Sequence, residues 1–393
     1  MNLFDDRWYE SAYQDPETGE MKYERRKFEE IPEQEQRSWY EGVCSNSEIE
    51  RILHIRNASD YILKLRADEI IDHTRIWRYF LKLSRYYGKD WSLERFFDAK
   101  NYVIFKHALN KDKQEKLEQV SYGSLLCNEP NGLIFSSPYG ICSVFSTSLR
   151  YFSMFSNLAL LDCDGKVPPH VSFNGLRIAA RLMLGTEALD FEMDPRGIIP
   201  QNVSEIIRKP FPFQSIFLAG HEYSHYLLGH LDNKKTQLRG LNRAHFKDDT
   251  DYKKINAYTI DQKHEFAADL GAMNEPLFED DYYETYYFYT LLWFAALSVF
   301  EALEDTMFPP IGHQSHPGAI ARYKNIIEHA RRPKRFDEKL FLEEIPSMID
   351  FYRQFMIEDC QTHADEYERY GSVYLDAPNT EWRGQELIDR KDY

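Results

Sequence analysis

The sequence predicts an α+β fold that is predominantly helical and contains one small sheet. Several long segments repeat apolar residues at the three- and four-residue spacing of an amphipathic helix. The short apolar run 133–135 lies between Pro-Asn-Gly at 130–132 and Pro-Tyr-Gly at 138–140, which is typical of a strand between turns. The chain has 393 residues, of which 43% are hydrophobic, so it is long enough to bury a substantial core.

The net charge and the cysteines indicate which binding partners and which redox environment to expect. The formal net charge is −16, from 48 basic and 64 acidic residues, which argues against binding to nucleic acid or to an anionic membrane surface. The five cysteines are scattered and form no Cys-x-x-Cys pair, so we expect reduced thiols, most of them in the core. The first residues carry no signal-peptide pattern. We therefore expect a cytoplasmic protein.

We expect residues 1–120 to form an N-terminal helical domain or arm. The segment 73–88 places Ile76, Tyr79, Phe80 and Leu83 on one face and ends at Gly88, a plausible helix C-cap. A shorter helix is expected at 90–97. This region contains no cluster of metal-ligand residue types, and a regulatory partner could bind through it.

Residues 121–335 should form the main core, and 336–393 a C-terminal helical extension. After the strand at 133–135, helices are expected at 144–161, 174–185 and through 219–230. The polar segment 231–258 is expected to be a loop or insertion that could gate a cleft. A helix should start near Asp261, with a Thr259/Gln262 capping box. The apolar run 286–300 is too short to span a membrane and should be a core helix.

The stretch AGHEYSHYLLGH, at 219–230, carries the strongest chemical signal. His221 and His225 are four residues apart, so on a helix they project from one face and can bind one cation. Glu222 lies about 100° around the helix, close enough to contact a ligand of that cation. This is the His-Glu-x-x-His arrangement of zinc hydrolases, in which the glutamate is the general base. The alternative is a pair of core histidines beside a surface glutamate.

A catalytic zinc ion needs a third protein ligand. His230 lies nine residues from His221, so it should point to the opposite side of the helix and cap its C-terminus. The better candidate is Glu265 in HEFAADLGA, because Asp269 shares its face and could hydrogen-bond the outer nitrogen of a ligand histidine. The neighbouring alanines and glycine would let two helices approach closely. The adjacent His264 points elsewhere, and a solvated acidic helix face is the alternative.

The segment SHPGAIAR contains a third candidate group. His316 precedes a proline that can begin a helix, and Arg322 follows six residues later. Both could stabilise an anionic tetrahedral intermediate. The alternative is an ordinary helix start and a solvated arginine.

The order HEYSH, EFAAD, HPGAIAR resembles the motif set of gluzincin metallopeptidases, and is most similar to CAAX-prenyl-protease and heat-shock membrane metallopeptidases. The resemblance covers about 219–322 and implies a zincin-like peptidase core. It also implies zinc on His221, His225 and Glu265, with Glu222 as general base and Asp269 behind a ligand histidine. His316 and Arg322 match the His-Pro and Arg positions of the most C-terminal motif of the group. In that group these residues assist binding of the substrate or the transition state.

The chain departs from the membrane members because it lacks their transmembrane helices. It also resembles the soluble Lit-type phage-exclusion peptidases and, more distantly, repressor-cleaving gluzincins. We therefore expect a zinc endopeptidase that cleaves intracellular protein or peptide substrates through a zinc-bound water. The resemblance to Lit-type peptidases alone also implies a role in antiviral defence. Two alternatives remain: a non-catalytic zinc-stabilised module that binds a protein, and a zinc hydrolase of a small molecule.

Overall fold

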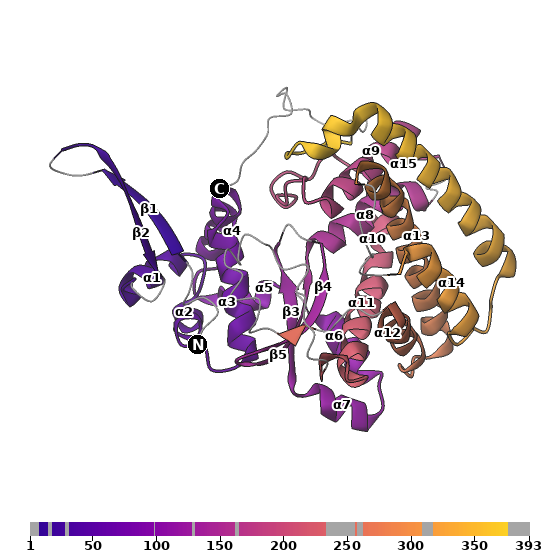
Figure 1. Cartoon of the computed structure of the whole chain (residues 1–393), viewed down its shortest axis with the longest axis horizontal. Coiled ribbons are helices and arrows are strands. Elements are labelled where there is room, and N and C mark those ends of the chain that lie inside the picture. The colour runs from indigo at the N-terminus through magenta and orange to yellow at the C-terminus, as the bar shows by residue number, and fades with distance from the viewer. Residues whose placement is uncertain are drawn as a thin grey trace.

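The fold is mostly helical, with one small mixed sheet and a separate β-hairpin (Figure 1). This computed structural model describes residues 8–14, 18–27, 31–97, 99–127, 130–161, 165–232, 256–257, 262–308 and 317–375. The α+β class expected from the sequence is confirmed at this level.

The N-terminal region begins with a hairpin and continues with helices. Strands β1 (Trp8–Gln14) and β2 (Met21–Lys27) pair antiparallel, although only helices were expected before residue 120. The expected helix at 73–88 is α4, which ends at Gly88 with a positive φ of 55°. The helices of this region are α1 (Glu33–Tyr40), α2 (Asn46–Leu53), α3 (Ala58–Ile71), α4 (Thr74–Tyr87), α5 (Leu93–Phe96), α6 (Lys100–His107) and α7 (Lys111–Leu117).

The sheet has the strand order β3-β5-β4-β6. Its strands are β3 (Val120–Leu125), β4 (Gly132–Ser137), β5 (Gly140–Ser146) and the two-residue β6 (Asn256–Ala257). β3 and β5 are parallel, whereas β4 pairs antiparallel with both β5 and β6. The expected helix at 144–161 is therefore wrong at its start, since 144–146 belong to β5. That strand has a neighbour on each side, so its apolar run lacks the alternation of a half-exposed strand.

Helices lie on both sides of this sheet: α3 packs against β3 and β5, and α11 (Pro210–Leu227) packs against β4 and β5 (Figure 1). α11 packs against β4, β5, α6 and α12, and therefore lies at the centre of the fold. Pro210 is its first residue, as expected for a residue whose missing N–H costs nothing there. The remaining helices are α8 (Ser148–Leu160), α9 (Pro169–Met183), α10 (Gln201–Arg208), α11 (Pro210–Leu227), α12 (Gln262–Asn274), α13 (Asp280–Met307), α14 (Ala319–His329) and α15 (Ile345–Glu368).

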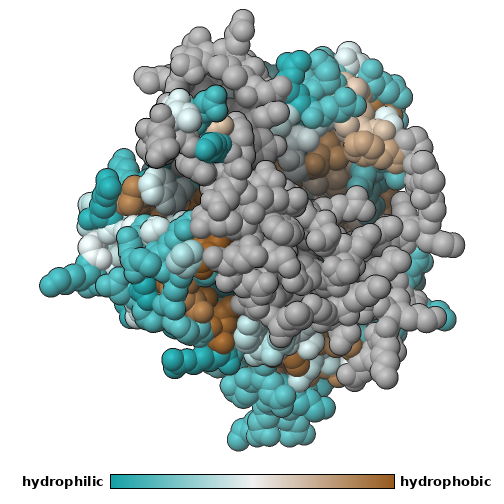
Figure 2. Space-filling model, turned by 60° about the vertical axis from the view of Figure 1, so that its left-hand side comes forward, coloured by the Kyte–Doolittle hydropathy of each residue, from teal (hydrophilic) through white to brown (hydrophobic). Residues whose placement is uncertain are grey.

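One hydrophobic cluster runs through all three segments expected from the sequence, and includes Tyr61, Phe135 and Met356. The four described cysteines are buried and form no disulfide with one another, which is consistent with the expected reduced thiols; Cys163 lies outside the described residues. Where the face in Figure 2 is coloured, hydrophilic side chains predominate and apolar ones form small groups.

Among the described residues, α13 is the one helix long and apolar enough to cross a membrane. However, 83% of its most apolar window is buried within the protein, so it is a core helix, as the sequence predicts for 286–300. Other helices of the protein cover the apolar surface of α13.

Candidate metal centre

Two helices bring three potential metal ligands together. His221 and His225 project from α11, and Glu265 projects from α12. One ligand atom from each of the three lies within 4.8 Å of the other two, and all three side chains are buried. This convergence spans a sequence separation of about 40 residues, so it depends on the packing of the two helices.

The spacing of these atoms fits one small cation. The Nε2 atoms of His221 and His225 are 3.1 Å apart. The carboxylate oxygens of Glu265 lie 3.4 Å from each of these nitrogens. A tetrahedral centre with bonds of about 2.0–2.1 Å places its ligand atoms roughly 3.3–3.4 Å apart. The donor set of two imidazoles and one carboxylate also fits zinc, and leaves a fourth position open.

Small residues explain how α12 approaches α11 so closely. A Cβ atom on Gly271 would lie 2.6 Å from Oγ of Ser224, which is closer than real Cβ atoms come. Ser224 itself donates to the carbonyl oxygen of Gly220 within α11. Ala268 and Ala272 are fully buried on the same helix as Glu265. A larger side chain at Gly271 would therefore push the Glu265 carboxylate away from the histidines.

Asp269 and Arg322 lie behind the ring of His221. Oδ1 of Asp269 is 2.9 Å from Nδ1 of His221, the nitrogen that faces away from Glu265. Arg322 donates two hydrogen bonds to the Asp269 carboxylate, at 2.8 and 2.6 Å. Its guanidinium also lies 3.8 Å from Glu265. Arg322 thus contacts the carboxylates that hold His221, rather than being the solvated arginine of the alternative reading.

His230 contacts the other ligand histidine. After α11 ends, Gly229 has a positive φ of 74°, and His230 begins a short 3-10 turn (His230–Asp232). Nδ1 of His230 lies 2.8 Å from Nδ1 of His225, and its ring stacks on that of His264 with centroids 4.0 Å apart. His230 is not part of the three-residue ligand group. The sequence placed it at the helix end but did not predict its contact with His225.

Glu222 lies between the metal centre and the first residues of β4. A Cβ atom on Gly132 would be 3.0 Å from Oε1 of Glu222, and the backbone N–H of Ile134 donates to the Glu222 carboxylate. The other oxygen, Oε2, is buried and has no hydrogen-bond partner among the described residues. A buried, unpaired carboxylate oxygen is costly unless it meets a proton, water or ligand. Gly132 and Ile134 were not identified from the sequence as contacts of this site.

The buried charges shift the pKa values of the site residues. Burial raises the pKa of Glu222 to about 7, which the nearby His221 only partly opposes. Burial would lower the pKa of His221, but hydrogen bonds to Asp269 and Glu265 outweigh it and raise that pKa to about 10. Burial lowers the pKa of His225 to about 3. Asp269 keeps a lowered pKa despite its burial, because Arg322 stabilises its charge.

The free edge of β4 is partly covered. β6 pairs with Phe135 and Ser136, so the far half of β4 already has a partner strand. The first residues of β4 include Gly132 and Ile134, which contact Glu222 and are not paired with β6 in the described part of the chain.

His316 and the Thr259 half of the expected capping box lie outside the described residues. The expectation that His316 stabilises a reacting oxyanion therefore stays a prediction. Neither a family model, nor a curated protein, nor a solved structure matches this chain.

Proposed function

We propose that this chain is a zinc-dependent endopeptidase with a zincin-like core that cleaves intracellular protein or peptide substrates. The observation that carries the proposal is the convergence of His221, His225 and Glu265 beside the unpaired oxygen of Glu222. A structural zinc site needs four protein ligands and no adjacent base. Three ligands and a carboxylate with a free oxygen favour catalysis over a zinc-stabilised binding module.

Zinc held by the three residues would polarise a scissile carbonyl group and lower the pKa of a water molecule. Glu222 would take a proton from the attacking water and return it to the leaving amine. The N–H of Ile134 donates to the Glu222 carboxylate, and Oε2 of Glu222 has no hydrogen-bond partner among the described residues.

The contacts of Arg322 favour a different role from the one that the sequence predicts. Its guanidinium is paired with Asp269, and Asp269 contacts the outer nitrogen of His221. We therefore propose that Arg322 is a positioning residue, which fixes the carboxylate that orients His221. Stabilisation of the oxyanion would then fall to the metal and to His316.

The test combines metal content with cleavage. The purified chain should contain one zinc ion, and extracts incubated with it should show new protein N-termini. Glu222→Gln should retain zinc and lose cleavage by at least about 100-fold, because general base catalysis typically contributes that much. An unchanged cleavage rate in a zinc-loaded Glu222→Gln variant would refute the mechanism. Zinc binding with no new N-termini would favour a binding module or a small-molecule hydrolase.

A further inference from the structure

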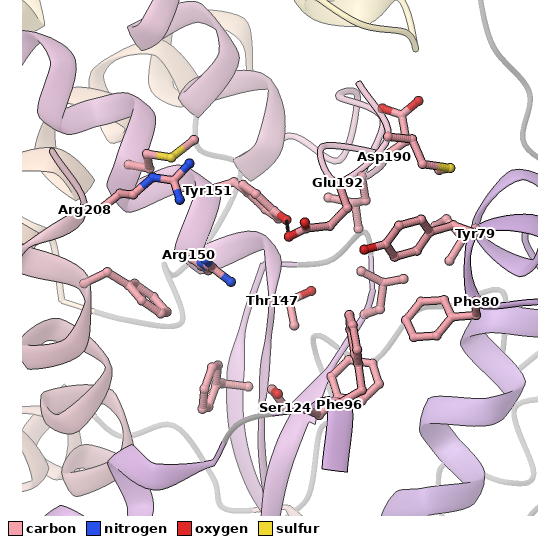
Figure 3. Close-up of a pocket in the computed structure, with 18 of the residues that line it drawn as sticks. Tyr79, Phe80, Phe96, Ser124, Thr147, Arg150, Tyr151, Asp190, Glu192 and Arg208 are labelled. Carbon is pink, nitrogen blue, oxygen red and sulfur yellow. Dashed lines mark hydrogen bonds between the residues drawn. The ribbon is translucent and has the colours of Figure 1, made fainter. Parts of the chain in front are cut away.

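A cavity of about 610 Å³ lies at the carboxyl ends of β3 and β5 (Figure 3). Its walls come from α4 and α5 on one side, and from α8 and α10 on the other. None of the proposed metal ligands lines it. Its volume is that of a small-molecule or side-chain pocket. The proposed chemistry leaves it without a role.

One side of the cavity is aromatic. Tyr79, Phe80 and Phe96 lie together on that side in Figure 3. The rings of Phe80 and Phe96 meet edge to face, with centroids 4.9 Å apart, and Phe80 also stacks on Phe97. Ring contacts of this kind hold the wall rigid and offer an apolar surface to another ring-sized group.

The opposite side carries two arginines. Arg150 and Arg208 lie there, on α8 and α10, across from the aromatic wall (Figure 3). Both are exposed, and neither forms an ion pair with a carboxylate among the described residues. Guanidinium groups without a partner are suited to bind a carboxylate through paired hydrogen bonds.

The acidic residues of the cavity are already paired. Glu192 accepts a hydrogen bond from the hydroxyl of Tyr151, at 2.9 Å. Asp190 forms ion pairs with Arg75 and Arg196, both at 2.7 Å. Arg75 and Arg196 offset the charge of Asp190, whereas the hydroxyl of Tyr151 satisfies an acceptor of Glu192 without neutralising it. The charges of Arg150 and Arg208 remain available to a ligand.

Thr147 adds an unpaired polar atom. It occupies the N-cap position of α8, yet its side chain makes no capping hydrogen bond. Its Oγ1 is buried and has no hydrogen-bond partner among the residues described. In Figure 3 this side chain lies between the arginines and the aromatic wall. A bound ligand would satisfy this atom, and a buried polar atom without a partner otherwise costs stability.

The cavity and the candidate metal centre border the same face of the sheet. Phe145 lines the cavity and is the cross-strand partner of Gly132. Directly opposed residues of an antiparallel pair project from the same face of the sheet. The ring of Phe145 therefore lies on the face from which Gly132 approaches Glu222, whose Oε1 would be 3.0 Å from a Cβ atom at that position.

We propose that the cavity binds a ring-sized apolar group that carries a nearby carboxylate. The aromatic wall would take the ring, Arg150 and Arg208 the carboxylate, and Thr147 a hydrogen bond between them. The inference rests on the proposed peptidase function. It makes the cavity a specificity pocket for substrates with an aromatic residue next to an aspartate or glutamate.

Binding of short peptides to the zinc-loaded Glu222→Gln protein, measured by calorimetry, tests the proposal. N-acetyl-Phe-Glu-amide should bind about tenfold or more tightly than N-acetyl-Phe-Gln-amide, because a hydrogen bond to a charged group is worth that much. It should also bind more tightly than N-acetyl-Ala-Glu-amide. The double variant Arg150→Gln/Arg208→Gln should abolish the preference for glutamate, and Thr147→Val should weaken binding several-fold. Arg85→Gln, an exposed arginine on α4 outside the cavity lining, is the matched control.

Equal binding of the three peptides, or a preference that survives the double arginine variant, would overturn the proposal. 2-Naphthylacetate serves as a second probe: if it binds more tightly than the peptides and depends on the same arginines, the site stands and its ligand is a free organic acid. Zinc content and cleavage by the unmodified chain are measured separately. If the peptides bind in the cavity as expected but the unmodified chain cleaves no protein, the binding site stands and only the peptidase function is refuted.

Discussion

Asp269 lies between His221 and Arg322, and its Oδ1 atom is 2.9 Å from Nδ1 of His221. The carboxylate therefore fixes which nitrogen of His221 carries the proton and which faces Glu265. Its own charge is held by Arg322, which keeps its pKa low despite complete burial. Two residues, Asp269 on α12 and Arg322 on α14, thus set the orientation of one imidazole ring on α11.

The first prediction concerns Asp269. Asp269→Asn preserves the size of the side chain but removes the charge that orients His221 and neutralises Arg322. We expect zinc affinity to fall by about 10- to 100-fold. Competition with a chelator of known affinity measures this change. Asp305→Asn, at an exposed position of α13, should leave the affinity unchanged. An affinity that survives Asp269→Asn would show that the contact plays no part in holding the metal.

The second prediction concerns Gly132. A methyl group added at this position would lie 3.0 Å from Oε1 of Glu222, so the carboxylate must move by a few tenths of an ångström. Because small misplacements of catalytic groups are costly, we expect Gly132→Ala to reduce cleavage roughly tenfold with zinc content unchanged. Gly318→Ala is the control, since its Cβ would have no heavy atom nearer than 3.7 Å. Equal effects of the two substitutions would count against the placement of β4.

The third prediction concerns the buried charges around Glu187. This carboxylate forms ion pairs of 2.8 Å with both Arg181 and Arg196, and all three side chains are buried. Glu187→Gln would leave two buried guanidinium groups short of a counter-charge. We expect a loss of about 3–5 kcal/mol in the free energy of unfolding, measured by denaturant titration. Glu205→Gln removes an exposed carboxylate and should cost little.

The fourth prediction concerns acid stability and Asp359. Burial opposes ionisation of this group, but hydrogen bonds from Arg177 and Tyr367 outweigh it and lower its pKa. The pKa of Asp359 is lower in the folded chain than in the unfolded chain, where it is about 3.9. The ionised group therefore stabilises the fold at pH values above about 3.9. That contribution is lost as the pH falls from there through the folded-state pKa. Asp359→Asn should flatten the dependence of melting temperature on pH in this window, whereas the exposed Asp350→Asn should not.

Local spacing was sufficient to predict the two helices that carry the candidate site and the residue types on them. The four-residue spacings of His221 with His225, and of Glu265 with Asp269, each put two side chains on one helical face. Their meeting across α11 and α12 follows from small residues such as Gly271, whose significance the sequence suggests. That the meeting forms a zinc site remains a proposal.

Contacts between distant segments could not be read from the sequence. The apolar run of β5 looks helical until its pairing with β3 and β4 is known. Arg322 meets Asp269 across 53 positions, and no local pattern marks an arginine on a helix as buried or solvated. Gly132 belongs to a recognisable turn signal, but its approach to Glu222 depends on how β4 crosses α11.

The contact between His225 and His230 makes the two histidines of the metal centre unequal electron donors. A cation bound through Nε2 of His225 leaves the proton on Nδ1, which would donate to Nδ1 of His230. A neutral imidazole draws that proton less strongly than the Asp269 carboxylate draws the proton of His221. In a metal-loaded site, His225 would therefore be the weaker of the two histidine ligands.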